Sequence, residues 1–338
     1  MQISGTGSDV TTMLRIGMIG AGWVTQHHLN AYKQLAGRAK VVAIADPVAE
    51  ARNRRAQAYS IPAVYANAAE MLDREKLDAV DVASPRETHV AMCELAGSKG
   101  LAILCQKPLA PNLQGAQKLV QNLPPSIRLM VHENWRFRPH YRLIAQWLNE
   151  GYIGKVRQAS MTILTSGLLP DAEGRLPAVE RQPFFATLDR LLLMEVMIHH
   201  VDTLRFLLGP LELQGASFGH SCPGVRGEDR ATLLMSSPSG MGVILNGDFM
   251  ARGYPPAQFD RLEIFGERGT IRFMESTLQL ISENHISQSV DLDANYMASY
   301  RGAIEHFLNC LASGAPFETS PADNLETLKL VEDAYARN

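Results

Sequence analysis

The sequence predicts an α/β protein in two parts: a doubly wound parallel sheet, followed by an α+β domain with an open, mostly antiparallel sheet. Two observations carry this prediction. Up to about residue 135, short apolar runs alternate with helical patterns, which is typical of a buried parallel sheet with helices on both faces. After Gly151, strand-like runs follow one another with short turns between them, which indicates antiparallel pairing.

The first part contains five predicted strands with helices between them. The strands are 14–20, 41–45, 78–83, 101–105 and 127–132. The helices are 23–36, 48–58, 86–99 and 111–121. Residues 1–13 are small and polar and lack the charged start and apolar middle of a signal peptide, so we expect a disordered lead-in.

The second part is expected to be rich in strands. Its helices are 138–150, a long one over 190–208 that stops at Gly209-Pro210, and two closing helices, 296–313 and 322–336. Its strands are Val156–Leu164, Ala231–Ser236, Gly242–Phe249, Leu262–Phe265 and Thr270–Phe273. Segment 168–183, rich in proline, glycine and charge, is expected to be a loop beside the site.

Composition excludes several classes of function. The 338 residues are 46% hydrophobic and 20% charged, as in soluble globular proteins. A net charge of −3 gives no reason to expect nucleic acid or an anionic membrane as partner, and no apolar run approaches a membrane span. The four cysteines are scattered with no C-x-x-C pair, which predicts reduced thiols in a cytoplasmic protein.

An apolar run ends at the turn Gly20-Ala21-Gly22, and a helix-compatible stretch opens with Trp23 and Val24. A second apolar run, about twenty residues further on, ends at Asp46, and together these form the layout of a dinucleotide-binding Rossmann unit. Gly20 permits the tight turn, and Gly22 lets the backbone approach a pyrophosphate held at the helix N-terminus. Asp46 can accept hydrogen bonds from both ribose hydroxyls of NAD and would repel the 2′-phosphate of NADP.

The same glycines also fit an ordinary strand-to-helix turn, because Thr25 occupies the place of the third glycine. NADP stays open as an alternative cofactor, since Arg52, Arg54 and Arg55 follow Asp46 closely. NAD is the cofactor we expect.

Residues just past the carboxyl ends of parallel strands face a bound dinucleotide. Lys107, fixed between Gln106 and Pro108, would point over the nicotinamide, where it could stabilise alkoxide character on a substrate oxygen. An ordinary surface lysine is the alternative. The other residues expected at the cofactor are Ser84, Pro85, His89, Gln106, Asn134 and Arg136, with Trp135 expected at the substrate.

A polar face interrupts the apolar helix predicted over 190–208. Glu195 and His199 are four residues apart and share a face, and Asp202 lies near it. Imidazole is the natural proton acceptor near neutral pH, and a carboxylate one turn away can orient it. Two alternatives remain: a satisfied core histidine, or a metal site, which the lack of ligand spacing disfavours, so that we expect no metal.

Taken together, these motifs resemble the Gfo/Idh/MocA family of NAD(P)-dependent oxidoreductases over nearly the whole chain. The opening turn with His28-Leu29-x-Ala31, Gln106-Lys107-Pro108, Arg136-Phe137-x-Pro139 and His199-x-x-Asp202 are similar to family motifs in the same order. The resemblance implies a Rossmann domain over 14–135, a substrate and oligomerisation domain over 136–320, and a last helix, 321–338, returning toward the Rossmann domain. It also implies a homodimer or homotetramer formed through the second sheet.

By this resemblance, Lys107 and His199 take the catalytic lysine and histidine positions, and Glu195 takes that of the family's aspartate. Several residues depart from the family pattern: Gln106 replaces a glutamate, Glu195 is longer than aspartate, Met197 replaces a glycine, and Arg86 stands where asparagine is common. The Glu-x-x-x-His variant is similar to a branch of bacterial aldose dehydrogenases.

The sequence therefore predicts NAD-dependent oxidation of a hydroxyl carbon in a small sugar, sugar acid or cyclitol. In this hypothesis Lys107, Glu195 and His199 contact the substrate, His199 removes the proton, and Glu195 orients His199 or binds a neighbouring hydroxyl. Two alternatives stay open: a non-catalytic regulatory protein that binds NAD(P) and a sugar, and an NADP(H)-dependent reductase.

Overall fold

The computed structural model describes residues 13–257 and 259–337, so nearly all of the predicted lead-in lies outside the described residues. The chain forms two compact units. The first takes its residues from Met1–Leu109, Lys118–His132 and Ala303–Ser320. The second takes its residues from Ala110–Gln117, Glu133–Gly302 and Pro321–Asn338.

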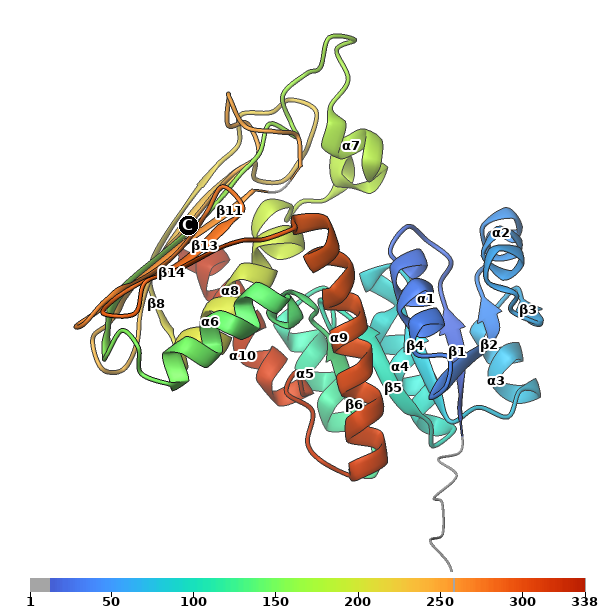
Figure 1. Ribbon diagram of the computed structural model, residues 1–338. Coiled ribbons are helices and arrows are strands. Elements are labelled where there is room, and N and C mark those ends of the chain that lie inside the picture. The colour runs from blue at the N-terminus through green and yellow to red at the C-terminus, as the bar shows by residue number, and fades with distance from the viewer. Residues whose placement is uncertain (1–12, 258, 338) are drawn as a thin grey trace, which may run out of the picture. The chain divides into compact units, whose positions relative to one another are not determined.

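The first unit is built on a six-stranded, all-parallel sheet (Figure 1). The strands are β1 (Leu14–Ile19), β2 (Ala39–Ala45), β3 (Ala63–Tyr65), β4 (Ala79–Val82), β5 (Ala102–Gln106) and β6 (Leu129–His132). Their order in the sheet is β3-β2-β1-β4-β5-β6. The chain therefore builds the sheet outward in one direction from β1 and in the other direction from β4, and ligands bind outside the carboxyl ends of the strands at such a switch point. Ile16, Met18, Val80 and Leu104 are completely buried, as strands covered on both faces require.

Helices connect these strands. They are α1 (Thr25–Gln34), α2 (Ala49–Tyr59), α3 (Ala68–Arg74), α4 (His89–Ser98) and α5 (Leu113–Asn122), with a 3₁₀ turn over Arg86–Thr88. The predicted strands and helices are present with small differences at their ends. β3 and α3 are additional elements.

The second unit contains an eight-stranded sheet in the order β14-β13-β12-β11-β7-β10-β9-β8. Its strands are β7 (Val156–Leu164), β8 (Glu212–Gly219), β9 (Arg230–Ser236), β10 (Gly242–Asp248), β11 (Asp260–Gly266), β12 (Thr270–Met274), β13 (Thr277–Ile281) and β14 (Ile286–Ser289). Neighbours pair antiparallel except β7 with β10, which confirms the mostly antiparallel prediction. Burial alternates along most strands, so one face is covered and the other is open.

Helices of the second unit lie along the covered face of its sheet (Figure 1). They include α6 (Pro139–Asn149), α8 (Ile198–Leu208) and α10 (Pro321–Arg337), while α7 (Pro177–Arg181) lies in the segment predicted as a loop. α10 packs on α8 and β8, and so belongs to the second unit.

The last part of the chain is divided differently from the predicted domains. Residues 303–320, which contain the end of α9 (Leu292–Ser313), belong to the first unit. Hydrogen bonds bind this segment to β6: Val131 N–H donates to the Thr319 carbonyl, and Arg128 Nη2 donates to the Ala315 carbonyl. The segment tied to the parallel sheet thus precedes α10.

The predicted helix 190–208 begins as a π-helical turn, Leu192–Met197, and only then continues as α8. A buried carboxylate organises the start of this turn, because Glu228 accepts hydrogen bonds from Leu191 N–H and Leu193 N–H at 3.2 and 2.9 Å. π-helical turns are rare and frequently mark functional sites. This π-helical turn contains Glu195 and ends two residues before His199.

Candidate active site

The glycine turn after β1 is built as the sequence predicts. Gly20 has φ +105°, and a Cβ there would lie 2.5 Å from the Ala83 carbonyl oxygen, so only glycine fits. A Cβ on Gly22 would meet no protein atom within 4 Å, which leaves its backbone open to a ligand. Together these two glycines form the cradle that a pyrophosphate needs.

Thr25 replaces the third glycine without opening the turn. Its side chain is completely buried, and its hydroxyl donates to the Gly20 carbonyl at 3.2 Å. Val24 occupies the N-cap position of α1 without a side-chain hydrogen bond, and Trp23 is 42% exposed beside the turn.

Asp46, at the end of β2, faces the same turn. Its Oδ2 accepts from Ala21 N–H and its Oδ1 from Val48 N–H, both at 2.8 Å. Each carboxylate oxygen keeps a further lone pair, so Asp46 can still accept ribose hydroxyls. Arg52 donates hydrogen bonds to the Asp46 and Pro47 carbonyl oxygens. This guanidinium, which could otherwise favour the 2′-phosphate of NADP, is thus bound to the backbone of the protein.

Arg55 is held in a similar way, since its Nη2 donates to the Gly22 carbonyl at 2.8 Å. Arg54 lies on the exposed side of α2 and contacts Glu50 at 3.7 Å. The three arginines that kept NADP open thus have contacts within the protein.

His89 links two loops at the carboxyl end of the sheet. Its ring is buried, with Nδ1 2.8 Å from the Pro108 carbonyl oxygen and Nε2 2.9 Å from the Ser84 carbonyl oxygen. Through these contacts His89 holds the Ser84-Pro85 turn against the loop that carries Lys107. Both of these contacts lie within the protein, so the structure supports a positioning role for a residue expected at the cofactor.

Lys107 follows β5 and is half-buried, and its bond to Pro108 is cis. The preceding Gln106 side chain folds back, so that its Oε1 accepts from Lys107 N–H at 2.8 Å. The backbone of the predicted catalytic lysine is therefore fixed on both sides.

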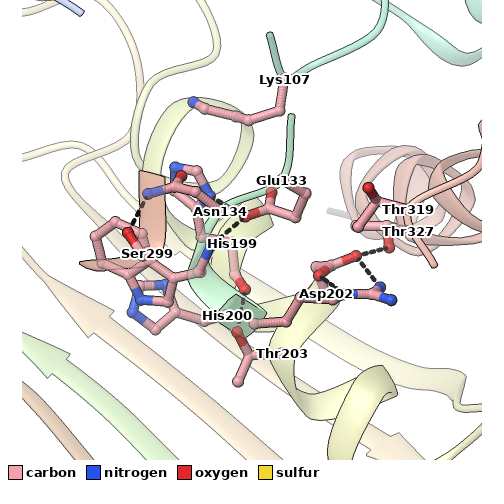
Figure 2. Close-up of polar contacts among 12 residues, drawn as sticks. Lys107, Glu133, Asn134, His199, His200, Asp202, Thr203, Ser299, Thr319 and Thr327 are labelled. Carbon is pink, nitrogen blue, oxygen red and sulfur yellow. Dashed lines mark hydrogen bonds and ion pairs between the residues drawn. The ribbon is translucent and has the colours of Figure 1, made fainter. Parts of the chain in front are cut away.

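In the second unit, His199 is held by a carboxylate from the end of β6. Its Nδ1 lies 2.5 Å from Glu133 Oε1, and both side chains are buried. The His199 ring stacks on Trp135, with centroids 4.6 Å apart and 17° between the planes. Figure 2 shows this histidine with Glu133 directed at it.

This contact changes the expected division of roles. No role was expected for Glu133, but it is the carboxylate on His199 Nδ1, whereas the sequence predicted that Glu195 orients the ring. Glu195 lies partly exposed in the π-helical turn, where the straight-helix geometry of the prediction does not apply. Its other expected role, contact with a substrate hydroxyl, stays a prediction.

Trp135 is 3% exposed and serves as a wall of this cluster. Its indole N–H donates to Asp260 Oδ2 at 3.2 Å, and the Arg138 guanidinium lies 3.6 Å from the ring centroid on the indole. Asp260 also contacts His200 at 3.0 Å. Burial alone would raise the pKa of Asp260, but His200, Arg138 and Trp135 bring it below its ordinary value.

Arg136 was expected at the cofactor, and the structure gives it an internal ion pair. It donates to both oxygens of Asp202, at 2.6 and 2.7 Å, and to Asp323 at 2.6 Å. Burial alone would lower the pKa of this guanidinium, but the two carboxylates raise it above its ordinary value, so it stays cationic. Asp202, expected near the polar face with His199, is thus part of the scaffold that joins α8 to α10.

Asn134, also expected at the cofactor, is 2% exposed and donates to Ser299 Oγ at 2.7 Å. The predicted site residues therefore divide between the units. The first unit contains the glycine turn, Asp46, His89 and Lys107. The second unit contains Asn134, Trp135, Arg136, Glu195 and His199.

Among the described residues, no group of three or more His, Cys, Asp or Glu side chains could hold a metal ion. Over the same residues, no helix combines the length and the apolar character that crossing a membrane requires.

The chain matches two family models in succession. Residues 14–129 match an oxidoreductase family with an NAD-binding Rossmann fold, and residues 141–272 match the Gfo/Idh/MocA C-terminal domain. The chain therefore belongs to the Gfo/Idh/MocA family of oxidoreductases, which confirms the resemblance drawn from its motifs.

Individual relatives are similar over most of their length. The chain is 30% identical to a D-apiose dehydrogenase of Paraburkholderia graminis, over 97% of this chain and 89% of that protein. It is 26% identical to an inositol 2-dehydrogenase of Rhizobium meliloti, over 95% and 96% of the two chains. Among solved structures, an oxidoreductase from Agrobacterium radiobacter in complex with NAD⁺, L-tartaric acid and magnesium superposes with a TM-score of 0.89 at 27% identity, covering 96% of both chains.

Proposed function

We propose that this protein is an NAD-dependent dehydrogenase that oxidises a hydroxyl carbon of a small sugar, sugar acid or cyclitol. The observation that carries the proposal is the buried contact between Glu133 and His199, because it makes a proton acceptor from an otherwise internal histidine. The names of the relatives, a D-apiose and an inositol dehydrogenase, support the substrate class.

The first unit fits the cofactor. Gly22 leaves open backbone at the helix N-terminus, and Asp46 retains lone pairs for the ribose hydroxyls. Bound NAD supplies the hydride acceptor. The engaged contacts of Arg52 and Arg55 and the carboxylate of Asp46 favour NAD over NADP.

Glu133 accepts the proton on His199 Nδ1, and in the proposal Nε2 is the nitrogen that accepts the proton of the substrate hydroxyl. In the proposed reaction, His199 Nε2 takes the hydroxyl proton as hydride leaves the same carbon. Lys107 donates to the substrate oxygen and stabilises its developing negative charge. Glu195 accepts a hydrogen bond from a neighbouring hydroxyl of the substrate.

The test is NADH formation by purified protein with NAD or NADP and a panel of aldoses, polyols and sugar acids. Turnover with NAD on a subset of the panel would establish the activity and its substrate class. Tight binding of NAD and of a sugar, with no turnover on any member, would favour the regulatory alternative.

Replacing Glu133 with glutamine is expected to lower kcat by about 10²-fold, less than the loss of the base itself. Because the carboxylate stabilises the protonated ring, its removal also moves the acid limb of the kcat profile to lower pH. Glu133→Asp should recover part of the activity, and Ser299→Ala serves as a control in the same cluster, since Ser299 accepts a hydrogen bond from Asn134. An unmoved acid limb in Glu133→Gln would contradict the assignment.

We further propose that the open face of the eight-stranded sheet joins subunits into a dimer or tetramer. Leu234 of β9 is 49% exposed on this face, and covering this apolar side chain would favour association. Light scattering on the purified protein and on Leu234→Glu should show an oligomer that the substitution weakens, and a wild-type monomer would refute the subunit contact.

The four cysteines are free and buried, which supports a cytoplasmic location.

A further inference from the structure

A row of buried polar side chains leads from the middle of the first unit to the backbone of Lys107. His28 and Asp81 are completely buried, and Gln106 is 8% exposed. His28 Nδ1 lies 2.8 Å from Asp81 Oδ2, and His28 Nε2 lies 3.2 Å from Gln106 Nε2. Gln106 Oε1 accepts from Lys107 N–H at 2.8 Å. These side chains come from α1, β4 and β5, and the row ends at the predicted catalytic lysine.

One fixed donor determines every proton in the row. Lys107 N–H can only donate, so the oxygen of the Gln106 amide must face it and the NH₂ group must face His28. The NH₂ group can also only donate, so His28 Nε2 accepts and the ring proton lies on Nδ1. That proton is then donated to Asp81. The geometry therefore requires a neutral His28 with a single tautomer.

The groups packed around His28 are compatible with this state. Burial, with Arg55 as a further cause, lowers the pKa of His27 to about 4, so it is uncharged at neutral pH. Burial, followed by Asp81, raises the pKa of Tyr32 well above its ordinary value. Burial likewise raises the pKa of the Cys105 thiol. From β6, the His132 ring lies against His28 with centroids 4.1 Å apart. Asp81 is the anionic group that His28 contacts.

We propose that Asp81, His28 and Gln106 form a positioning relay for Lys107, and that the amide at Gln106 makes the relay independent of pH. The inference rests on the proposed function, because positioning Lys107 matters to turnover only if Lys107 acts on the substrate. None of the three residues needs to touch the substrate. Their effect is to fix the backbone from which the Lys107 side chain extends.

A carboxylate at the same place would behave differently. In Gln106→Glu, one oxygen would still accept from Lys107 N–H, but the other would face the lone pair of His28 Nε2. The contact becomes favourable only if His28 takes a second proton and lies as a cation between Asp81 and the new carboxylate. The variant would thus exchange a neutral relay for one that depends on an ionisation.

The sign of the pH effect follows from this exchange. In the variant, the contact between His28 and the new carboxylate is favourable only while the ring carries its second proton. That proton is lost as the pH rises, and the stabilising contribution is lost with it. The kcat of Gln106→Glu should therefore show a fall with rising pH that the wild-type profile lacks.

Gln106→Met is the matched control, because it removes both hydrogen bonds and adds no charge. We expect it to lower kcat by about 10- to 100-fold, as displacements of about 1 Å do, with an unchanged shape of the pH profile. If Gln106→Met retains wild-type kcat, or if Gln106→Glu and wild type share one profile shape, the relay is refuted.

A second measurement needs no substrate. In protein labelled with ¹⁵N-histidine, His28, assigned by its change in Gln106→Glu, should show one protonated nitrogen, Nδ1, at neutral pH. A proton on Nε2, or two protons on the wild-type ring, would overturn the proposal. Since this spectrum is independent of turnover, a silent substrate panel would count against the proposed function and leave the relay to be decided by the spectrum.

Discussion

His199→Ala should lower kcat by about 10²- to 10⁴-fold, the range measured for loss of a positioned general base. NAD binding should be nearly unchanged, because the substitution lies in the second unit and the glycine turn and Asp46 lie in the first. The measurement is kcat on the substrate identified by the panel, together with the dissociation constant of NAD by fluorescence titration.

The control for this experiment is His285→Ala, the same substitution at an exposed position. Combining His199→Ala with Glu133→Gln provides a sharper test. If Glu133 acts through His199, the double variant should be no slower than His199→Ala alone. Removing the histidine already removes the effect of the carboxylate, so the two losses are not additive. Additive losses would separate the two residues, and a wild-type kcat in His199→Ala would remove the assignment of the base.

The parts of the fold that were predicted are those with a strong local pattern. The parallel strands are continuous apolar runs between helices, and that pattern is visible in any single stretch of sequence. β3 has only three residues, all partly or fully exposed, and β14 is exposed along its whole length, so neither has an apolar pattern to detect. α3 did have a signal: Asn67 caps it by accepting from Glu70 N–H at 2.8 Å.

The candidate site divides in the same way. Lys107 was found because a strand end followed by proline is a local feature, and His199 because of its helical spacing from Glu195. Glu133 and His199 are 66 residues apart, as are Arg136 and Asp202, so no local spacing shows either contact. The π-helical turn was missed for a related reason, because the carboxylate that shapes its start, Glu228, comes from a later part of the chain.

Lys107→Met should lower kcat by about 10²- to 10³-fold, the typical cost of removing one donor to a developing oxyanion. Methionine keeps the length of the side chain and removes its charge, while the Gln106 and His89 contacts, which involve the backbone of the Lys107-Pro108 loop, are preserved. The loss should therefore appear in kcat, with the thermal midpoint close to that of wild type.

The matched control is Lys118→Met, the same substitution at an exposed position of α5. Lys107→Arg separates charge from geometry: arginine retains the positive charge, but its planar, longer head group presents donors at other positions. If charge alone stabilised the substrate oxygen, Lys107→Arg would keep most of the activity. If the relay positions a single ammonium group against that oxygen, Lys107→Arg should be nearly as slow as Lys107→Met. The second result would connect the buried row of Asp81, His28 and Gln106 to catalysis, because a relay that fixes the backbone is useful only where the place of the charge matters.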